Sequence, residues 1–164
     1  MTKAKGPIHK VYFRRRREGK TNYAKRLAFV KSRKTRMVVR KTNSSIIIQF
    51  IDFAFGGDKT ILTVQSTKLK KLFSWPAKRN VYTAYLTGLY AGKEAKKKNV
   101  KDFVLDIGLH RPTKGNVLFA ALKGALDAGL NTAYQEEMVP TAKLTSPPDA
   151  LKVAFEETKK RITG

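Results

Sequence analysis

The sequence predicts an α/β fold, in which a mixed sheet is combined with helices, from the order of its strand-like and helix-like segments. Three strand-like segments come first, at residues 37–41, 46–55 and 60–66, and two short turns join them. A helical segment, a fourth strand-like segment and another helical segment follow between residues 80 and 128. Short turns predict an antiparallel meander, and a helix between strands predicts a right-handed crossover to a parallel strand.

The three N-terminal strands are predicted from their composition and from the turns between them. They are rich in Val, Ile, Phe and Thr, which are typical of strands. The turns read Asn43-Ser44-Ser45 and Gly56-Gly57-Asp58, and the second lacks the Lys and the Ser or Thr of a phosphate-binding loop. The stretch from Ile46 to Phe53 has apolar residues at odd and even positions. We therefore expect it inside the sheet, with layers on both sides.

A short helix is expected before these strands, beginning near Thr21 or Asn22, either of which can cap it. One side of this helix carries an apolar stripe made of Tyr23, Leu27 and Val30. We expect that stripe to dock on the core. The far side carries Lys25, Arg26 and Phe29. An aromatic ring beside cations can stack on a nucleotide or pack against a neighbouring segment, and the residues leave both possibilities open.

A longer helix is expected from Asn80 to about Lys98. Its apolar positions are Tyr82, Tyr85, Leu86, Leu89 and Tyr90. A second stripe consists of the small residues Ala84, Gly88, Ala91, Gly92 and Ala95. Because glycine costs up to about 1 kcal/mol in a helix relative to alanine, two glycines here predict a close approach to a sheet or to a neighbouring backbone.

The rest of the chain is expected to hold one more strand and two more helices. The strand is expected from Val100 to Ile107, followed by a loop over residues 108–115 and a helix over about residues 116–128. Gly129 stands where a left-handed cap ends a helix. After residue 131 we expect a loop and one peripheral helix over about residues 149–162.

Charge is the strongest indication of function. The 164 residues include 35 Lys or Arg and 12 Asp or Glu, a formal net charge of +23. Residues 1–41 hold 16 of these cations and a single acid, Glu18, so about two thirds of the excess lies in the first quarter of the chain. Such an excess favours a polyanionic partner, nucleic acid first. A membrane-surface helix is not indicated, because Gly6 and Pro7 interrupt the segment.

Composition excludes several classes of protein. Without Cys, the chain has no disulfide scaffold, Cys-ligated metal or cysteine nucleophile. Two histidines are too few for a metal site built on several His ligands. No apolar run is long enough to span a membrane, and the first residues do not resemble a secretory signal. We therefore expect an intracellular protein without a cofactor.

A nuclease is an alternative at this point. Asp102 and Asp106 would share a face of one strand, but four residues at about 3.3 Å each separate them by about 13 Å, whereas two-metal nucleases hold their ions about 4 Å apart. Asp52 could neighbour Asp106 across strands, which leaves one acidic pair open. The other explanation is that these acids cap helices, pair with Arg or face solvent.

The most informative cluster is basic. The segment from Phe13 to Tyr23 contains four consecutive arginines, Arg14, Arg15, Arg16 and Arg17, followed by Lys20, Thr21 and Asn22. Arginine bonds phosphate oxygens through a planar fork and also stacks on bases. Four successive guanidinium groups cannot all point one way, so they suit a folded RNA that wraps around the segment. A nuclear-targeting sequence, a solvated face or a DNA-packaging protein would carry similar charge.

Four blocks of sequence resemble a known family: FRRRREGKTNYAKRL from Phe13, YLTGLYAGKEA from Tyr85, DIGLHRPTKG from Asp106 and FAALKGALDAGLN from Phe119. In this order, over most of residues 8–131, they resemble the large-ribosomal-subunit proteins of the eighteenth family, in the archaeal and eukaryote-like branch that binds 5S rRNA. The resemblance implies a three-layer mixed sheet of the ribonuclease-H-like kind, without catalytic acids and with a basic N-terminal extension. It also implies a non-enzymatic place in the cytoplasmic ribosome, at the central protuberance, where 5S rRNA is fixed to the large-subunit rRNA beside neighbouring ribosomal proteins.

Position by position, the resemblance implies that residues of the basic segment contact RNA. They are Arg14, Arg15, Arg16, Arg17, Lys20, Thr21, Asn22, Tyr23 and Arg26, and we add Phe13, which precedes the arginines. In the loop after the fourth strand, His110, Arg111 and Lys114 either touch RNA or belong to a rigid turn. Cations near the start of the sheet are expected to face RNA because a sheet interior cannot hold them unpaired; they are Arg33, Arg36, Arg40 and Lys41.

We expect three parts: a basic arm (1–20), an α/β domain (21–131) and a C-terminal loop and helix (132–164), where the resemblance weakens.

Overall fold

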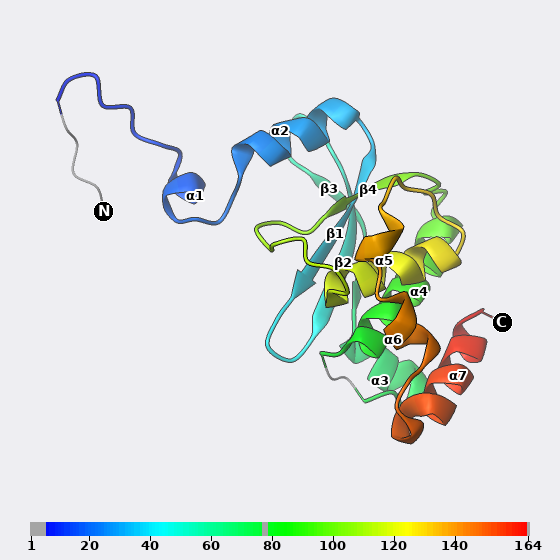
Figure 1. Ribbon diagram of the computed structural model, residues 1–164. Helices are drawn as coiled ribbons and strands as arrows, with labels where there is room; N and C mark the ends of the chain where they lie inside the picture. Colours follow the sequence, from blue (N-terminus) through cyan, green and yellow to red (C-terminus); the bar gives the residue numbers. More distant parts are fainter. Residues whose placement is uncertain (1–5, 77–78, 164) are drawn as a thin grey trace.

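The computed structural model describes residues 6–76 and 79–163 of the chain. Its four strands form one sheet in the order β3-β2-β1-β4. They are β1 (Thr35–Lys41), β2 (Ile46–Asp52), β3 (Lys59–Gln65) and β4 (Phe103–Asp106). β2 pairs antiparallel with both β1 and β3, and β4 pairs parallel with β1. The predicted meander and the mixed α/β sheet are confirmed (Figure 1).

Two helices, α4 (Val81–Lys97) and α5 (Val117–Asp127), cover one face of the sheet (Figure 1). α4 connects the β3 side of the chain to β4, as predicted for the crossover helix. On this face of the sheet, Met37 and Phe50 are register partners and are fully buried. Phe103 meets Phe50 edge on, with ring centroids 5.9 Å apart. Alternate strand residues and the apolar sides of both helices thus form one core.

α4 and α5 pack closely because glycines lie at their crossing. A Cβ atom at Gly88 of α4 would overlap the backbone carbonyl of Ala121 in α5. A Cβ atom at Gly124 of α5 would likewise overlap the backbone of α4 at Tyr85. The small-residue stripe of α4 therefore meets a neighbouring backbone, as predicted.

The helices begin and end largely at the predicted residues. Asn22, Asn80 and Asn116 each precede a helix, and each side-chain oxygen accepts a backbone N–H group of the first turn. Gly129 follows α5 with a φ of +90°, in the left-handed region. Three short α-helices among the described residues were not predicted: α1 (Arg14–Arg17), α3 (Thr67–Phe73), which directly follows β3, and α6 (Thr141–Thr145). Each is too short to show an apolar period.

The opposite face of the sheet is only partly covered. On this side the β2 residues Ile47, Gln49 and Ile51 are half-buried, whereas Ile46, Ile48 and Phe50 are buried on the core side. The third layer consists of α2 (Tyr23–Ser32), which lies over one end of this face (Figure 1). The middle strand β2 therefore lies inside the sheet with a layer on each side, as expected, but the layer on this side is much thinner.

The side of α2 that turns toward the sheet is also not the one predicted. No described residue of α2 is buried, and Leu27 is 54% exposed. Instead, Arg26 bonds Asp58 in the β2–β3 turn, and Phe29 lines the space between α2 and the sheet. The side of α2 that faces the sheet therefore carries Arg26, which pairs with the β2–β3 turn, and Phe29, and it is not the predicted apolar stripe.

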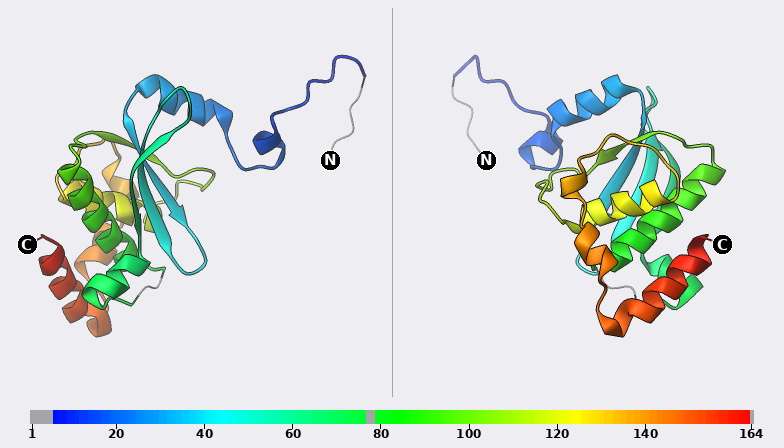
Figure 2. Two further views of the ribbon diagram at one scale, coloured as in Figure 1. Left: turned by 180° about the vertical axis from the view of Figure 1, so that it is seen from behind. Right: turned by 45° about the vertical axis from the view of Figure 1, so that its right-hand side comes forward.

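The C-terminal residues form η1 (Glu136–Met138), α6 (Thr141–Thr145) and α7 (Asp149–Thr163). α7 is the helix predicted for this region. Its Phe155 is 5% exposed, and its ring contacts Trp75, Tyr82 and Tyr85 with centroid separations of 5.6 to 6.4 Å. α7 therefore packs on α4 on the side away from the sheet (Figure 2). Among the described residues, no helix combines the length and the apolar character needed to cross a membrane.

Candidate nucleic-acid interface

The N-terminal arm, of which residues 6–20 are described, extends away from the sheet beyond α2 (Figures 1 and 2). Its four arginines form a single helical turn, α1 (Arg14–Arg17), and all four are exposed. Because successive helical residues differ by about 100° around the axis, the guanidinium groups point in different directions. Glu18, the one acid in the arm, lies 2.9 Å from Nζ of Lys20 and 3.8 Å from Nε of Arg14. One carboxylate offsets little of this charge.

Aromatic rings lie next to the arginines of the arm. The guanidinium carbon of Arg16 lies 4.2 Å from the ring centroid of Tyr12. The rings of Phe13 and Tyr23 are tilted against each other, with centroids 5.1 Å apart. Phe13 is nevertheless 71% exposed. The arm therefore offers both cations and open π faces, the two kinds of group that bind unpaired nucleotides.

A hollow of about 230 Å³ lies between the arm, α2 and the partly covered face of the sheet. Its charged lining consists of six cations and two carboxylates: Arg15, Lys20, Lys25, Arg26, Arg36, Arg40, Asp58 and Asp106. Phe29 and Leu109 add apolar surface to it. Nε of Arg15 donates to Oγ1 of Thr21 at 2.8 Å, which fixes this arginine at the rim. We refer to this site as the cationic hollow.

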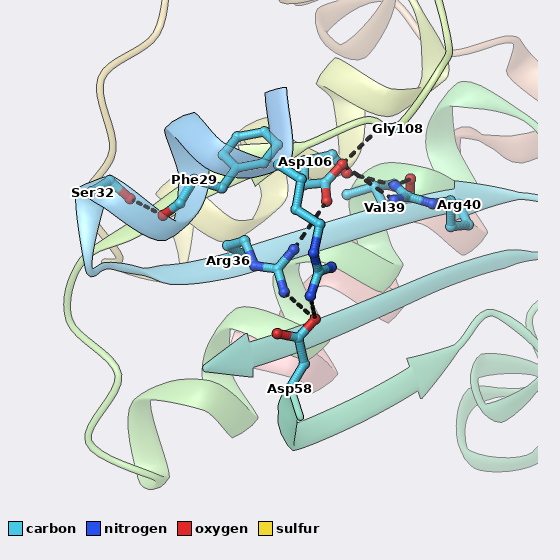
Figure 3. A network of polar contacts seen from close by, with 9 residues as sticks. Phe29, Ser32, Arg36, Val39, Arg40, Asp58, Asp106 and Gly108 are labelled. Atoms are coloured by element: carbon cyan, nitrogen blue, oxygen red, sulfur yellow. Dashed lines mark hydrogen bonds and ion pairs between the residues drawn. The ribbon is translucent and has the colours of Figure 1, made fainter. Parts of the chain in front are cut away.

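Asp58 ties α2 to the sheet inside the cationic hollow (Figure 3). Its Oδ2 accepts hydrogen bonds from Nη2 of Arg36 at 2.6 Å and from Nη2 of Arg26 at 2.9 Å. Burial by itself raises the pKa of the Asp58 carboxyl, but the hydrogen bonds from Arg36 and Arg26 outweigh it, so the pKa is lowered. Asp58 is therefore a stable anion that holds two arginines from different elements.

Asp106 organises the other side of the hollow and the loop after β4 (Figure 3). Its Oδ1 accepts from the backbone N–H of Gly108 at 2.7 Å and from Nη2 of Arg40 at 3.2 Å, and its Oδ2 lies 3.6 Å from Nη1 of Arg36. Gly108 has a φ of +66°, and a Cβ atom there would lie 3.0 Å from Cζ of Arg40. Asp106 thus has a structural role, because it holds Arg40, Arg36 and the loop after β4 together.

The acidic pair that would suit a nuclease is not formed. Asp52 accepts a hydrogen bond from Oγ1 of Thr35, at 2.6 Å, where β1 begins. Asp106 is instead the register partner of Val38, and β1 lies between β2 and β4. The pairing of Asp52 with Asp106, which the sequence left open, is therefore excluded. Within residues 6–76 and 79–163, no cluster of three or more His, Asp or Glu side chains could hold a metal ion.

The cations on β1 and just before it differ in how accessible they are to a ligand. Arg36 is 5% exposed and is engaged by two carboxylates. The expectation that Arg36 faces RNA is corrected, because Asp58 and Asp106 pair with this cation inside the protein. The side chain of Arg40 is 40% exposed, so part of it remains accessible to a ligand although it pairs with Asp106. Arg33 is exposed at the end of α2, and Lys41 is half-buried at the end of β1.

The loop after β4 brings further predicted residues to the same region. Burial, and then the positive charges of Lys41 and Arg40, lower the pKa of His110. Arg111 is exposed. Nζ of Lys114 lies 2.5 Å from a carboxylate oxygen of Glu137, so its charge is shared with an exposed acid. His110 of the loop therefore lies close to the cations at the end of β1.

Eight residues that line the hollow were not among the predicted RNA contacts: Lys25, Phe29, Val38, Ile51, Asp58, Asp106, Gly108 and Leu109. Lys25 lies beside Phe29 on the helix, but its position over the sheet depends on the rotation of α2. Leu109 is 54% exposed and lines the hollow from the loop after β4. Leu109 carries no local sequence signal, because its position follows from how the loop after β4 is placed on the sheet.

The chain matches the family model described as ribosomal large subunit proteins 60S L5 and 50S L18, over residues 8–103 and 94–135. It is 49% identical over 137 residues to the large ribosomal subunit protein uL18 of Aeropyrum pernix, an alignment that covers 83% of this chain and 64% of that protein. It is 51% identical over 138 residues to the protein of the same name from Korarchaeum cryptofilum, covering 84% of this chain and 70% of that protein. The chain thus spans less than two thirds of the Aeropyrum relative. The matched residues include most of the arm, the cationic hollow and the loop after β4.

Proposed function

This chain belongs to the family of ribosomal large subunit proteins 60S L5 and 50S L18, and we propose that it is a non-enzymatic constituent of the large ribosomal subunit that binds 5S rRNA. The proposal assigns the RNA-binding role to the arm and the cationic hollow. It gives the α/β body, residues 21–131, the task of positioning them. Residues 132–164 form the C-terminal part, whose helix α7 packs on α4 through Phe155.

The observation that carries this proposal is the exposed helical turn Arg14–Arg17 beside the cationic hollow. Phosphate contacts by Arg and Lys release counterions and supply most of the affinity for a nucleic acid. Guanidinium groups that point in several directions fit a backbone that curves around the arm, as the backbone of a folded RNA does. The surface of the arm thus matches RNA better than a straight duplex.

The polar and aromatic residues next to the arginines supply selectivity. RNA is recognised through splayed bases that stack on aromatic rings and through hydrogen bonds to the sugar and base edges. Phe13 and Tyr23 offer the rings. Lys20, Thr21 and Asn22 lie at the junction of the arm and α2. The Asn22 side-chain oxygen already caps α2, which leaves its amide nitrogen as the group that contacts RNA.

A second part of the proposal concerns the large-subunit rRNA. In a protein that attaches 5S rRNA at the central protuberance, other exposed cations would contact the large-subunit rRNA and neighbouring ribosomal proteins. We place Arg33, Arg40, Lys41, His110, Arg111 and Lys114 among the candidate contacts, and we leave out Arg36 because it is buried and paired.

The decisive experiment recovers and sequences the RNA that co-purifies with the protein and then measures binding to 5S rRNA transcribed in vitro. We expect 5S rRNA to be enriched and to bind more tightly than duplex DNA of equal length. Equal binding to duplex DNA would instead support a DNA-packaging protein. RNA cleavage with Mg²⁺ or Mn²⁺ that an Asp106→Asn variant abolishes would overturn the non-enzymatic assignment.

A further inference from the structure

Two aromatic side chains stand exposed at the β2–β3 turn. Phe55 has a relative exposure of 103% and Phe53 of 43%. Their ring centroids lie 5.7 Å apart with an interplanar angle of 69°, so the edge of one ring meets the face of the other. The turn is closed by a hydrogen bond from the Gly57 N–H to the Ala54 carbonyl at 3.1 Å. This geometry presents the rings to solvent in a defined arrangement.

The rings make no contribution to the core. The buried cluster of the protein takes alternate residues of β2 up to Phe50, and it does not include Phe53 or Phe55. Large apolar side chains left in water favour an interaction with a partner. Because the rings lie on a turn of a strongly basic protein, the partner that complements them is anionic and contains flat apolar surfaces.

The turn is continuous with the cationic hollow. Asp58, three residues after Phe55, is bonded to Arg26 of α2 and Arg36 of β1, and both arginines line the hollow. The turn and α2 lie at the same end of the sheet in both figures (Figures 1 and 2). The acids beside the rings are occupied, since Asp52 accepts from Thr35 and Asp58 from the arginines. These carboxylates therefore oppose an anionic ligand less than free acids would.

We infer that Phe53 and Phe55 form a stacking platform for an unpaired nucleobase of the RNA whose phosphates occupy the cationic hollow. The inference rests on the proposed function and extends it to a surface outside the predicted arm. A phosphate groove with aromatic rings at its edge is the general arrangement by which proteins bind single-stranded nucleotides. The open face of Phe55 receives the base, and Phe53 supports the ring from its side.

The test compares three double variants in binding to 5S rRNA transcribed in vitro. Phe53→Leu with Phe55→Leu keeps apolar surface but removes both π faces. Phe53→Tyr with Phe55→Tyr keeps the π faces. We expect the Leu pair to weaken binding by about 5- to 100-fold, the cost of one lost stacking contact, and the Tyr pair to bind nearly as the wild type does. Val153→Ala removes an exposed apolar side chain on α7, which is 67% exposed, and serves as the control with unchanged affinity.

The third variant, Phe53→Ala with Phe55→Ala, separates stacking from apolar contact. If the Ala pair loses affinity while the Leu pair binds as the wild type, the rings contact RNA without stacking and the inference is overturned. If all three pairs bind as the wild type, the rings do not contribute to RNA binding, which also overturns the inference. Photo-crosslinking to RNA that contains 4-thiouridine should place a nucleotide on the peptide that carries the two phenylalanines. Failure of the wild-type protein to bind 5S rRNA would refute the proposed function itself.

Discussion

Arg36 and Asp58 lie 22 residues apart in the chain, yet Nη2 of Arg36 donates to Oδ2 of Asp58 at 2.6 Å. The arginine lies on β1 and is almost completely buried, whereas Asp58 lies in the β2–β3 turn and also holds Arg26 of α2. One carboxylate therefore links the sheet, the turn and the helix that leads to the arm. The internal pairing of Arg36 explains how a protein with so large a cationic excess folds with an arginine inside it.

Replacing Arg36 by alanine should lower the free energy of unfolding by about 2 to 3 kcal/mol, because it leaves partly buried carboxylates without one of their donors. Urea unfolding followed by far-UV circular dichroism measures the change. Lys34→Ala, which removes an exposed cation two residues earlier, is the matched control and should change stability by less than about 0.5 kcal/mol. Equal effects of the two substitutions would show that the pair is not structural.

The contribution of Asp58 to stability should depend on pH. Its pKa in the folded protein is lowered from the ordinary value of 3.8, so the ionised form stabilises the fold. The sign follows from linkage: the contribution is complete at pH values well above 3.8 and is lost as the pH falls through the lowered pKa of the folded state. Wild type and Asp58→Asn should therefore differ most in urea midpoint at neutral pH and converge in acid. A difference that stays constant from neutral pH to about pH 2 would contradict the argument.

Replacing Arg14, Arg15, Arg16 and Arg17 by alanine should leave the unfolding midpoint unchanged, since all four are exposed and α1 buries no residue. Affinity for 5S rRNA should fall by orders of magnitude, as measured by filter binding. The control removes the same number of charges elsewhere by replacing the exposed residues Lys143, Lys152, Lys160 and Arg161 with alanine. If both quadruple variants lose the same affinity, net charge rather than the arm determines binding.

Binding to 5S rRNA should weaken steeply with salt. If about 6 to 10 phosphates are contacted, affinity should fall by about 10³ to 10⁵ between 50 and 200 mM salt. In the variant without the four arm arginines, the slope of log K against log salt should be shallower by about 3 to 4, because each lost phosphate contact removes about 0.9. A slope equal to that of the wild type would mean that these arginines do not contact phosphates.

Gly88→Ala should destabilise the protein, because the new Cβ atom would overlap the backbone of Ala121 and force α4 and α5 apart. Overpacking of a core typically costs about 1 to 3 kcal/mol of stability. We expect a cost near the upper end of this range, because the new atom meets backbone, which cannot move aside as a side chain can. Gly56→Ala is the control, since a Cβ atom there meets nothing within 4 Å and the residue has no positive φ. Thermal melts measure the stability of both variants, and we expect a lower melting temperature for Gly88→Ala. Equal melting temperatures would show that α4 and α5 are not closely packed at their crossing.

Much of this protein can be read from short stretches of its sequence. The strands, the main helices and the Asn caps at positions 22, 80 and 116 follow from local propensity and from side chains that bond the next turn. The concentration of cations in the arm is equally visible, because it depends on composition alone. The small residues of α4 predict a close neighbour, although they do not say that α5 provides it.

Other features were decided only by the tertiary structure. The rotation of α2, the burial of Arg36 and the engagement of Asp106 depend on partners 22 to 66 residues away. Register places these groups on one face of the sheet, and no local pattern encodes which carboxylate meets which guanidinium. The sequence by itself determined that the protein carries a basic arm on an α/β body. Folding decided which cations stay free for a ligand, because pairing inside the hollow removes some of them and leaves the others open.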